Sequence, residues 1–199
     1  MEQQLFIKSL VKIVPKWIQN SSFEKIGHSA SNEIEFLIYP EFILPFLAFL
    51  KNHCQTQCKQ LMDVTAVDFP VREKRFQVVY NLLSIDKNSR IRVKSKIDSV
   101  TAIASVTSLF SCAAWWEREV WDMFGVFFFD HPDCRRILTD YGFKGHPLRK
   151  DFPLSGYVEV RYDDSEKRVV SEPVELAQSF RFFDFSSPWL QNGMLPQKP

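Results

Sequence analysis

Long apolar runs are missing from this sequence, and so is an excess of charge of one sign. The longest apolar candidate, residues 42–50, is about half the roughly 20 residues that a membrane-spanning helix needs, and Pro45 interrupts it. The 25 basic residues are balanced by 24 acidic residues, which argues against nucleic-acid binding, because proteins with that role usually carry a clear basic excess. No arginine precedes Arg72, which argues against a typical mitochondrial presequence.

Cysteine and glycine are also scarce, with 4 and 6 residues respectively. The spacing of Cys54, Cys58, Cys112 and Cys134 suits neither a zinc site nor an iron–sulfur cluster. Cys54 and Cys58 together with His53 form the best metal-site candidate, but we favour reduced thiols without a metal. The phosphate-binding patterns G-x-G-x-x-G and G-x-x-x-x-G-K-[ST] are absent. The sequence therefore predicts that this chain binds no metal and no cofactor.

The hydrophobic content of 45% is enough for a packed core, and its pattern predicts both helices and strands. We expect helices at residues 5–18 and from Pro45 to about His53, because proline is tolerated in the first turn of a helix. We expect strands at residues 34–39, 61–69, 75–85 and 90–97. The last strand alternates between apolar and basic residues, which is typical of an antiparallel sheet covered on one face. The predicted fold is α+β: a two-layer domain, residues 1–150, with a mainly antiparallel sheet covered by helices.

The pattern changes after Asp151. Residues 151–199 lose helical periodicity but carry bulky aromatic residues, which a disordered tail would lack. These aromatic residues are Phe180, Phe182, Phe183, Phe185 and Trp189. We expect an extended C-terminal arm that lies across a partner protein, with the aromatic side chains as anchors. The alternative is that the arm folds back on its own domain.

The stretch WWEREVWDMFG, residues 115–125, lies in a predicted helix at residues 112–124. Ser111 is a suitable N-cap, and Gly125 is suited to end the helix in the left-handed conformation. A helical projection predicts an apolar face that contains Ala113, Val120, Met123 and Phe124.

Four other residues of this helix define its polar side and two exceptions to the pattern. Arg118 and Asp122 fall on the wet side as an i,i+4 pair. Glu117 falls within the apolar face, whereas Trp115 falls on the wet side, where it suggests a contact surface. A buried carboxylate is costly unless it is paired. We therefore expect Glu117 to bind one of the nearest arginines, Arg135, Arg136 or Arg149, and so to hold the following loop against the helix.

The loop that follows contains two histidines that are candidates for acid–base or metal chemistry. His131 and His146 each precede a proline, however, so both favour shaped turns, and no nucleophile–base pair is apparent. Residues 131–151 carry five basic and three acidic residues, a small excess for nucleic-acid binding. Intrinsic catalysis and nucleic-acid binding remain alternatives to the interpretation that we favour, a rigid docking surface for another protein.

Residues 117–164 closely resemble the 30 kDa subunit of respiratory complex I, a family with mitochondrially encoded members, known as subunit 9 of NADH dehydrogenase, and with bacterial members. The family pattern is Glu-Arg-Glu, two residues, an acid, two apolar residues, six residues, His, three residues and a base. It is filled here by Glu117, Arg118, Glu119, Asp122, Met123, Phe124, His131 and Arg135. A looser likeness covers roughly residues 60–190, and Asp130, Cys134 and Lys144 depart from the family's expected Asn, Leu and Glu.

The resemblance implies a core scaffold subunit in the hydrophilic arm of NADH:ubiquinone oxidoreductase, near the quinone-reducing module, with no catalytic residue of its own. Flavin and iron–sulfur clusters are implied in partner subunits, and the implied partners are the 49 kDa, PSST-like and TYKY-like subunits rather than nucleic acid. The implied location is peripheral, on the matrix side of the mitochondrial inner membrane with the gene in the organelle, or alternatively on the cytoplasmic face of a bacterial membrane. A related hydrogenase or quinone reductase is a further alternative. We expect structural or interface roles for Glu117, Arg118, Glu119, Asp122, His131, Arg135, Arg136, His146, Arg149, Phe182, Phe183 and Trp189.

Overall fold

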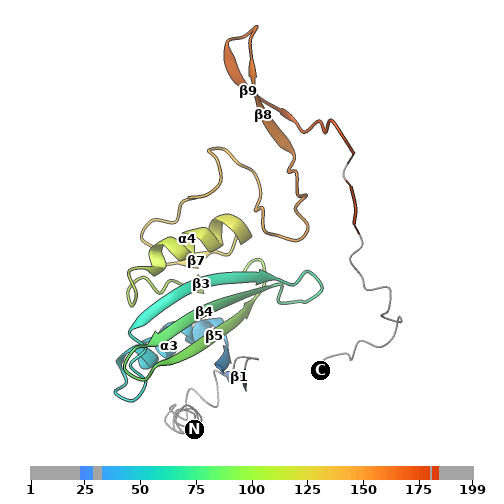
Figure 1. The fold of residues 1–199 in the computed structure, drawn as a ribbon. Coiled ribbons are helices and arrows are strands. Elements are labelled where there is room, and N and C mark those ends of the chain that lie inside the picture. Colours follow the sequence, from blue (N-terminus) through green and yellow to red (C-terminus); the bar gives the residue numbers. More distant parts are fainter. Residues whose placement is uncertain (1–22, 29–32, 180, 184–199) are drawn as a thin grey trace, which may run out of the picture. The chain divides into compact units, whose positions relative to one another are not determined.

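The computed structural model describes residues 23–28, 33–179 and 181–183 (Figure 1). The chain divides into two compact units, Met1–Leu154 and Ser155–Pro199. The helix predicted for residues 5–18 lies outside the described residues.

A five-stranded sheet is the framework of the first unit, with the spatial order β1-β2-β5-β4-β3. The strands are β1 (Phe23–His28), β2 (Ile34–Ile38), β3 (Gln60–Asp68), β4 (Phe76–Ser84) and β5 (Ser89–Ile97). Neighbouring strands are antiparallel except β2 and β5, which run parallel with Ile34 opposite Ile91. The four predicted strands are confirmed, and their ends differ from the prediction by one residue at most. The mainly antiparallel α+β sheet is also confirmed, whereas the parallel pair was not expected.

The two α-helices of the described residues, α3 (Ile43–Asn52) and α4 (Ala113–Phe124), contribute to a single core on one face of the sheet. Phe36 lies opposite Val93 and Val93 opposite Tyr80, so these three side chains share that face. Phe46 of α3 packs edge-on against Phe36, with ring centroids 5.3 Å apart. Helix α4 lies along β3 (Figure 1). The predicted two-layer arrangement is thus confirmed.

Helix α3 follows a 3-10 turn, η1 (Pro40–Phe42), and carries Pro45 in its first turn, as predicted. Neither α-helix of the described residues has the length and apolar character needed to cross a membrane.

The opposite face of the sheet carries the basic residues of β5, as the alternation in that strand predicted. Arg92 binds Glu35 at 2.9 Å and Asn81 at 3.1 Å, and Lys94 binds Glu35 at 2.7 Å. These bonds cross from β2 through β5 to β4. Partly exposed ion pairs of this kind each stabilise a fold only slightly, so the apolar face supplies most of the stability.

Two small sheets accompany the five-stranded sheet. Strand β6 (Ile103–Ala104) pairs in parallel with β7 (Phe128–Phe129). This pairing joins the segment before α4 to the segment after it. In the second unit, β8 (Val158–Asp163) and β9 (Arg168–Pro173) form an antiparallel hairpin. The hairpin was not predicted, although Val158, Val160 and Tyr162 alternate with charged residues in the manner of a strand.

Candidate functional site

Helix α4 carries the Glu-Arg-Glu block and ends as the sequence predicts, with Gly125 in the left-handed conformation at φ +75°. Its start differs from the prediction. Cys112 occupies the cap position, and no side chain caps the helix, so the prediction of Ser111 as N-cap is wrong. The backbone N–H of Ala113 instead donates to the carbonyl of Phe110 in the preceding turn, which leaves less need for a side-chain cap.

Glu117 points into the core, as the helical projection predicts, and its side chain has no exposed surface. Its Oε2 atom accepts a hydrogen bond from the Ser105 hydroxyl at 2.6 Å, and its Oε1 atom accepts one from the Val106 N–H at 2.7 Å. Burial raises the pKa of Glu117 to about 7, although these two hydrogen bonds act in the opposite direction. Glu117 thus ties α4 to the segment that follows β6.

The predicted arginine partner of Glu117 is wrong. Arg135 pairs with Asp133 at 2.9 Å, Arg136 binds Asp122, and Arg149 donates to the carbonyl of Phe124 at 2.6 Å. The physical reason is direction: Glu117 faces the sheet, whereas these arginines lie along the outer side of α4 and at its C-terminal end.

Asp122 does not form the predicted exposed pair with Arg118, because its side chain is buried. Its carboxylate accepts backbone N–H bonds from Ile137, Leu138 and Thr139 at 3.2, 2.8 and 2.9 Å. The Thr139 hydroxyl donates at 2.6 Å and Arg136 at 3.1 Å. Burial alone would raise the pKa of Asp122, but the hydrogen bonds from Thr139, Leu138 and Ile137 lower it to about 2. This carboxylate therefore organises the loop at residues 137–139.

The C-terminal carbonyls of α4 are bound by the chain that comes after that loop. His146 Nδ1 donates to the carbonyl of Asp122 at 2.9 Å, and the Leu148 N–H donates to that of Met123 at 3.1 Å. Arg149 donates to the carbonyl of Phe124, the last residue of the helix. Three backbone carbonyls that a helix end leaves without intrahelical partners are thus hydrogen-bonded. Burial lowers the pKa of His146, which favours the neutral ring. His146 is therefore a structural contact at the helix end.

The close approach of the Arg149 and His146 side chains to the end of α4 explains why a glycine occupies position 125. A Cβ atom there would lie 2.4 Å from Nη2 of Arg149 and 2.6 Å from the His146 ring. Gly125 is needed both for its backbone conformation and for space.

His131 lies beside the N-terminal half of α4, with 1% of its side chain exposed. Its Nδ1 atom accepts the N–H of Asp133 at 3.1 Å, which leaves the ring proton on Nε2. Nε2 lies 3.2 Å from the carbonyl oxygen of Ala114 and 3.8 Å from Oε2 of Glu117. The His131–Pro132 sequence thus forms a turn that packs on the helix.

A second network, around the buried carboxylate of Asp68, holds residues 150 and 151 at the end of the loop that follows α4. The sequence patterns did not predict this network. Arg75 makes a two-pronged pair with Asp68 at 2.6 and 2.7 Å and also reaches Asp151 at 3.0 Å. The Lys150 N–H donates to Asp68 at 2.8 Å. Alternation along β3 could have predicted that Asp68 is buried, because it lies on the same face of the strand as the apolar residues Val64 and Ala66.

The outer side of α4 carries the remaining residues of the block. Trp115 is 66% exposed, as predicted, with the Arg118 guanidinium 5.4 Å from its ring. Arg118 also donates to the carbonyl of Arg135 at 3.1 Å, and Glu119 is half-buried.

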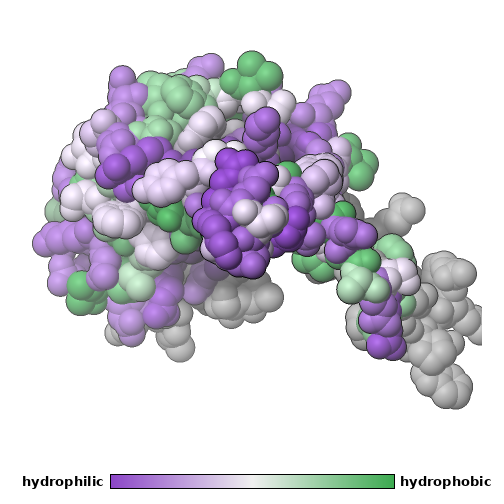
Figure 2. Space-filling model, turned by 90° about the horizontal axis from the view of Figure 1, so that it is seen from above, coloured by the Kyte–Doolittle hydropathy of each residue, from purple (hydrophilic) through white to green (hydrophobic). Residues whose placement is uncertain are grey.

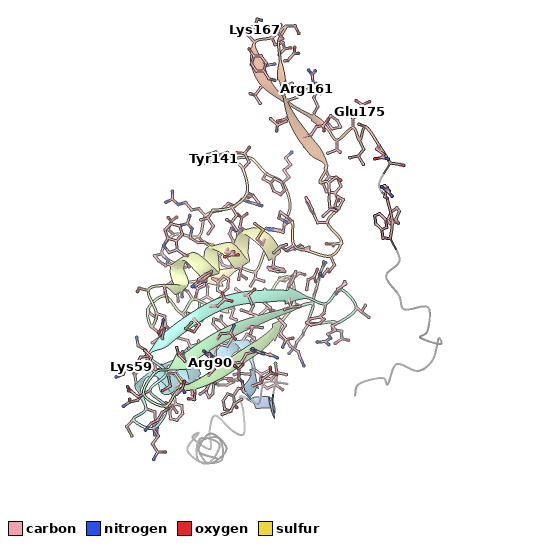
Figure 3. All side chains as sticks on the ribbon, in the orientation of Figure 1. Lys59, Arg90, Tyr141, Arg161, Lys167 and Glu175 are labelled. Atoms are coloured by element: carbon pink, nitrogen blue, oxygen red, sulfur yellow. The ribbon has the colours of Figure 1, made fainter. Side chains whose placement is uncertain are left out.

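Large apolar side chains are exposed along residues 115–154. They are Trp115, Phe127, Phe129, Leu138, Tyr141, Leu148 and Leu154. Tyr141 is fully exposed and stands at the outermost point of the loop after α4 (Figure 3). Figure 2 shows apolar and hydrophilic side chains side by side on the surface seen from above. We call residues 115–154 the docking region.

The cysteines do not gather into a ligand set. Among the described residues, no group of three or more His, Cys, Asp or Glu side chains is placed to hold a metal ion. Burial raises the pKa of Cys58 to about 12, so its thiol keeps its proton, and it faces the Thr56 carbonyl. Cys54 and Cys112 are exposed. His53, Cys54 and Cys58 are thus not gathered into a metal-binding group in the part of the chain that the structure describes.

Known respiratory-chain proteins resemble this chain over most of its length. A family model described as "Respiratory-chain NADH dehydrogenase, 30 Kd subunit" matches residues 36–158. The chain is 62% identical over 186 residues to NADH-ubiquinone oxidoreductase subunit 9 of Prototheca wickerhamii, which covers 94% of each chain. It is 57% identical over 194 residues to NADH dehydrogenase [ubiquinone] iron-sulfur protein 3 of Oryza sativa subsp. japonica, with 97% of this chain and 99% of the rice chain covered.

A solved structure of the membrane-bound sulfane sulfur reductase, an archaeal respiratory membrane complex, contains a chain of similar fold. The TM-score is 0.59 at 25% identity, with 74% of this chain and 85% of that chain covered. The extent of the family match and the identity to full-length relatives confirm the resemblance that the sequence indicated. The chain belongs to the family of the 30 kDa subunit of respiratory-chain NADH dehydrogenase, the NADH:ubiquinone oxidoreductase.

Proposed function

We propose that this chain is a scaffold subunit, without a cofactor of its own, in the hydrophilic arm of NADH:ubiquinone oxidoreductase. In this role it supports assembly, and through assembly the transfer of electrons from NADH to ubiquinone near the quinone-reducing module. Family membership supports the assignment to the enzyme, and the surface of the β8–β9 hairpin supports the role.

The hairpin has one apolar face and one charged face. Tyr162 lies opposite Val169, and Val160 shares their face along the strand. These three side chains are 58–63% exposed. On the charged face Arg161 (Figure 3) pairs with Glu172 at 2.7 Å. A two-stranded hairpin is only marginally stable in water, so an uncovered apolar face suits contact with another protein.

We infer that residues 151–199 form the partner-binding arm beside a domain at residues 1–150. Phe182 and Phe183 are largely exposed and serve as anchors in this proposal, whereas the other expected anchors, Phe180, Phe185 and Trp189, lie outside the described residues. The partners are the 49 kDa subunit and the cluster-bearing PSST-like and TYKY-like subunits.

The docking region supplies a second contact surface in this proposal. Arg136 and Arg149 hold its loop from inside, with His146 and Asp122, while Trp115 and Tyr141 project outward. Aromatic side chains on a rigid backbone are favoured at interface hot spots.

The scattered cysteines support the proposal that this chain holds no iron–sulfur cluster of its own. Flavin and iron–sulfur clusters then reside in partner subunits, and this chain positions those subunits. We place the chain on the matrix side of the mitochondrial inner membrane, as a peripheral subunit. The relatives come from plants and an alga, which contain mitochondria, and this supports that location.

The proposal is tested by placing a lysine on either face of the hairpin. Val160→Lys is expected to reduce incorporation of the chain into the NADH-oxidising particle by at least about tenfold, because a lysine would be buried in the contact. Glu159→Lys, the neighbouring control on the charged face, is expected to leave incorporation near the wild-type level. The measurement is native-gel fractionation with NADH oxidation stained in the gel and this chain quantified by mass spectrometry.

Two results would count against the proposal. A wild-type chain that does not comigrate with an NADH-oxidising particle removes the assignment to the enzyme. Normal incorporation of the Val160→Lys chain removes the role of the hairpin but leaves that assignment in place.

A further inference from the structure

Glu117 has few hydrogen-bond donors for a buried carboxyl group. It receives one bond from the Ser105 hydroxyl and one from the Val106 N–H, and both donors are neutral. An ionised carboxylate offers about four acceptor positions, and a buried charge without a partner is costly. The surroundings of Glu117 therefore favour the neutral acid.

Ser105 is placed to serve both protonation states of Glu117. Its hydroxyl lies 2.9 Å from that of Thr107, and either oxygen can be the donor. With Glu117 ionised, Ser105 donates to the carboxylate. With Glu117 protonated, the acid donates to Ser105, which in turn donates to Thr107. Both directions leave each of these groups with a partner, so the site is built to accept and release a proton.

The other groups that face Glu117 do not supply a positive charge. Tyr80, on β4, has a buried hydroxyl without a hydrogen-bond partner among the described residues. Burial raises the pKa of Tyr80, and the charge of Glu117 raises it further, which keeps the phenol neutral. Burial, followed by the charge of Glu117, also raises the pKa of Cys134. Arg118, whose charge also acts on Cys134, turns outward to the carbonyl of Arg135.

His131 is the histidine beside Glu117, and its Nδ1 atom accepts the N–H of Asp133 at 3.1 Å. The Nε2–H group points toward the Ala114 carbonyl at 3.2 Å and has Oε2 of Glu117 as its nearest alternative acceptor, at 3.8 Å.

We propose that Glu117 is a buried proton-binding site that controls the position of the turn formed by residues 131–133. With the proton bound, Glu117 is linked through Ser105 to Thr107, and His131 stays on the Ala114 carbonyl. When the proton leaves to solvent, the carboxylate draws the Nε2–H of His131 to itself, and the turn moves with the ring. The inference does not depend on the proposed function, because it uses only contacts within this chain.

Infrared difference spectroscopy of the full chain tests the site directly. Wild-type protein is expected to show a protonated carboxyl band that disappears as pH rises through about 7. The band should be missing in Glu117→Gln and kept in Glu119→Gln, which removes the half-buried neighbour in the same block. A wild-type spectrum without such a band, or a band that survives in Glu117→Gln, would overturn the proposal.

Amide hydrogen exchange of the wild-type chain provides a test that needs no variant. The Asp133 N–H is bound to the His131 ring, whereas the Arg149 N–H is bound in the other His–Pro turn, to the carbonyl of His146. After correction for intrinsic pH dependence, the protection of the Asp133 N–H is expected to change severalfold between pH 6 and pH 8, while that of the Arg149 N–H stays constant. Equal behaviour of the two amides would show that the turn does not respond to Glu117.

The folding equilibrium gives the third test and has a defined sign. Because the pKa of Glu117 is raised on folding, the stabilisation is present below the unfolded value of 4.5 and is lost as pH rises through about 7. The folding constant of wild type relative to Glu117→Gln is expected to fall by about two orders of magnitude over this interval. A ratio that does not change with pH would contradict the proposal.

Discussion

Glu117 and Asp122 are both buried carboxyl groups on helix α4, but they have different donors. Asp122 accepts three backbone N–H bonds, a hydroxyl bond and a guanidinium bond, whereas Glu117 accepts two bonds from neutral donors. The pKa of Asp122 is lowered to about 2 and that of Glu117 is raised to about 7. The difference teaches that donor number and charge, rather than exposure, decide whether a buried acid is ionised. Asp122 acts as a fixed anion, whereas Glu117 changes between the neutral acid and the anion as pH passes through about 7.

Removal of the charge at Asp122 is expected to have the largest effect on stability. Asp122→Asn would place an NH2 group among N–H donors and leave Arg136 without its anion. We expect the free energy of unfolding to fall by about 3–5 kcal/mol. Urea unfolding of the full chain measures this loss, and Asp86→Asn, at an exposed position, is the control. A loss below about 1 kcal/mol would mean that Asp122 is not the anion described here.

The close packing at the end of α4 is tested next. Gly125→Ala is expected to destabilise the fold by about 2–4 kcal/mol, because a left-handed alanine is strained and its Cβ would overlap Arg149 and His146. Gly142 has nearly the same φ, +73°, and a Cβ added there would meet no atom within 4 Å. Gly142→Ala should therefore lose only the stability that the left-handed backbone conformation costs an alanine, about 1 kcal/mol. Equal losses in the two variants would contradict the packing argument.

Acid titration should give the smallest effect, with a sign opposite to that of Glu117. Because the pKa of Asp122 is lowered on folding, its contribution is present above the unfolded value of 3.8 and is lost as pH falls toward about 2. The stability advantage of wild type over Asp122→Asn is expected to shrink by about 2 kcal/mol between pH 4 and pH 2. An advantage that stays constant in this range would remove the contrast between the two acids.

Local patterns predicted much of the fold. Alternation located four strands of the sheet, Pro45 located the start of α3, and Gly125 located the end of α4. The same projection predicted that Glu117 is buried and Trp115 exposed. These features depend on residues close in sequence, so periodicity is sufficient to find them.

The partners of the buried acids were not predictable in this way. A helical projection gives the direction of a side chain but not the segment that packs against it. Asp122 was placed on the wet side because the segment at residues 137–139, which covers it, has no regular period. The parallel pairing of β2 with β5 depends on the order of strands across the sheet, which alternation within a strand does not report.

That parallel pairing has a consequence for how the chain is made. Glu35 and Arg92 bind across β2 and β5 although they are 57 residues apart. A ribosome adds about 5–20 residues per second, so β5 emerges from the exit tunnel several seconds after β2. During this time the strand edge and the apolar side of α3 lack their final neighbours. The nascent chain therefore passes through a period in which a chaperone has an unfinished core to bind.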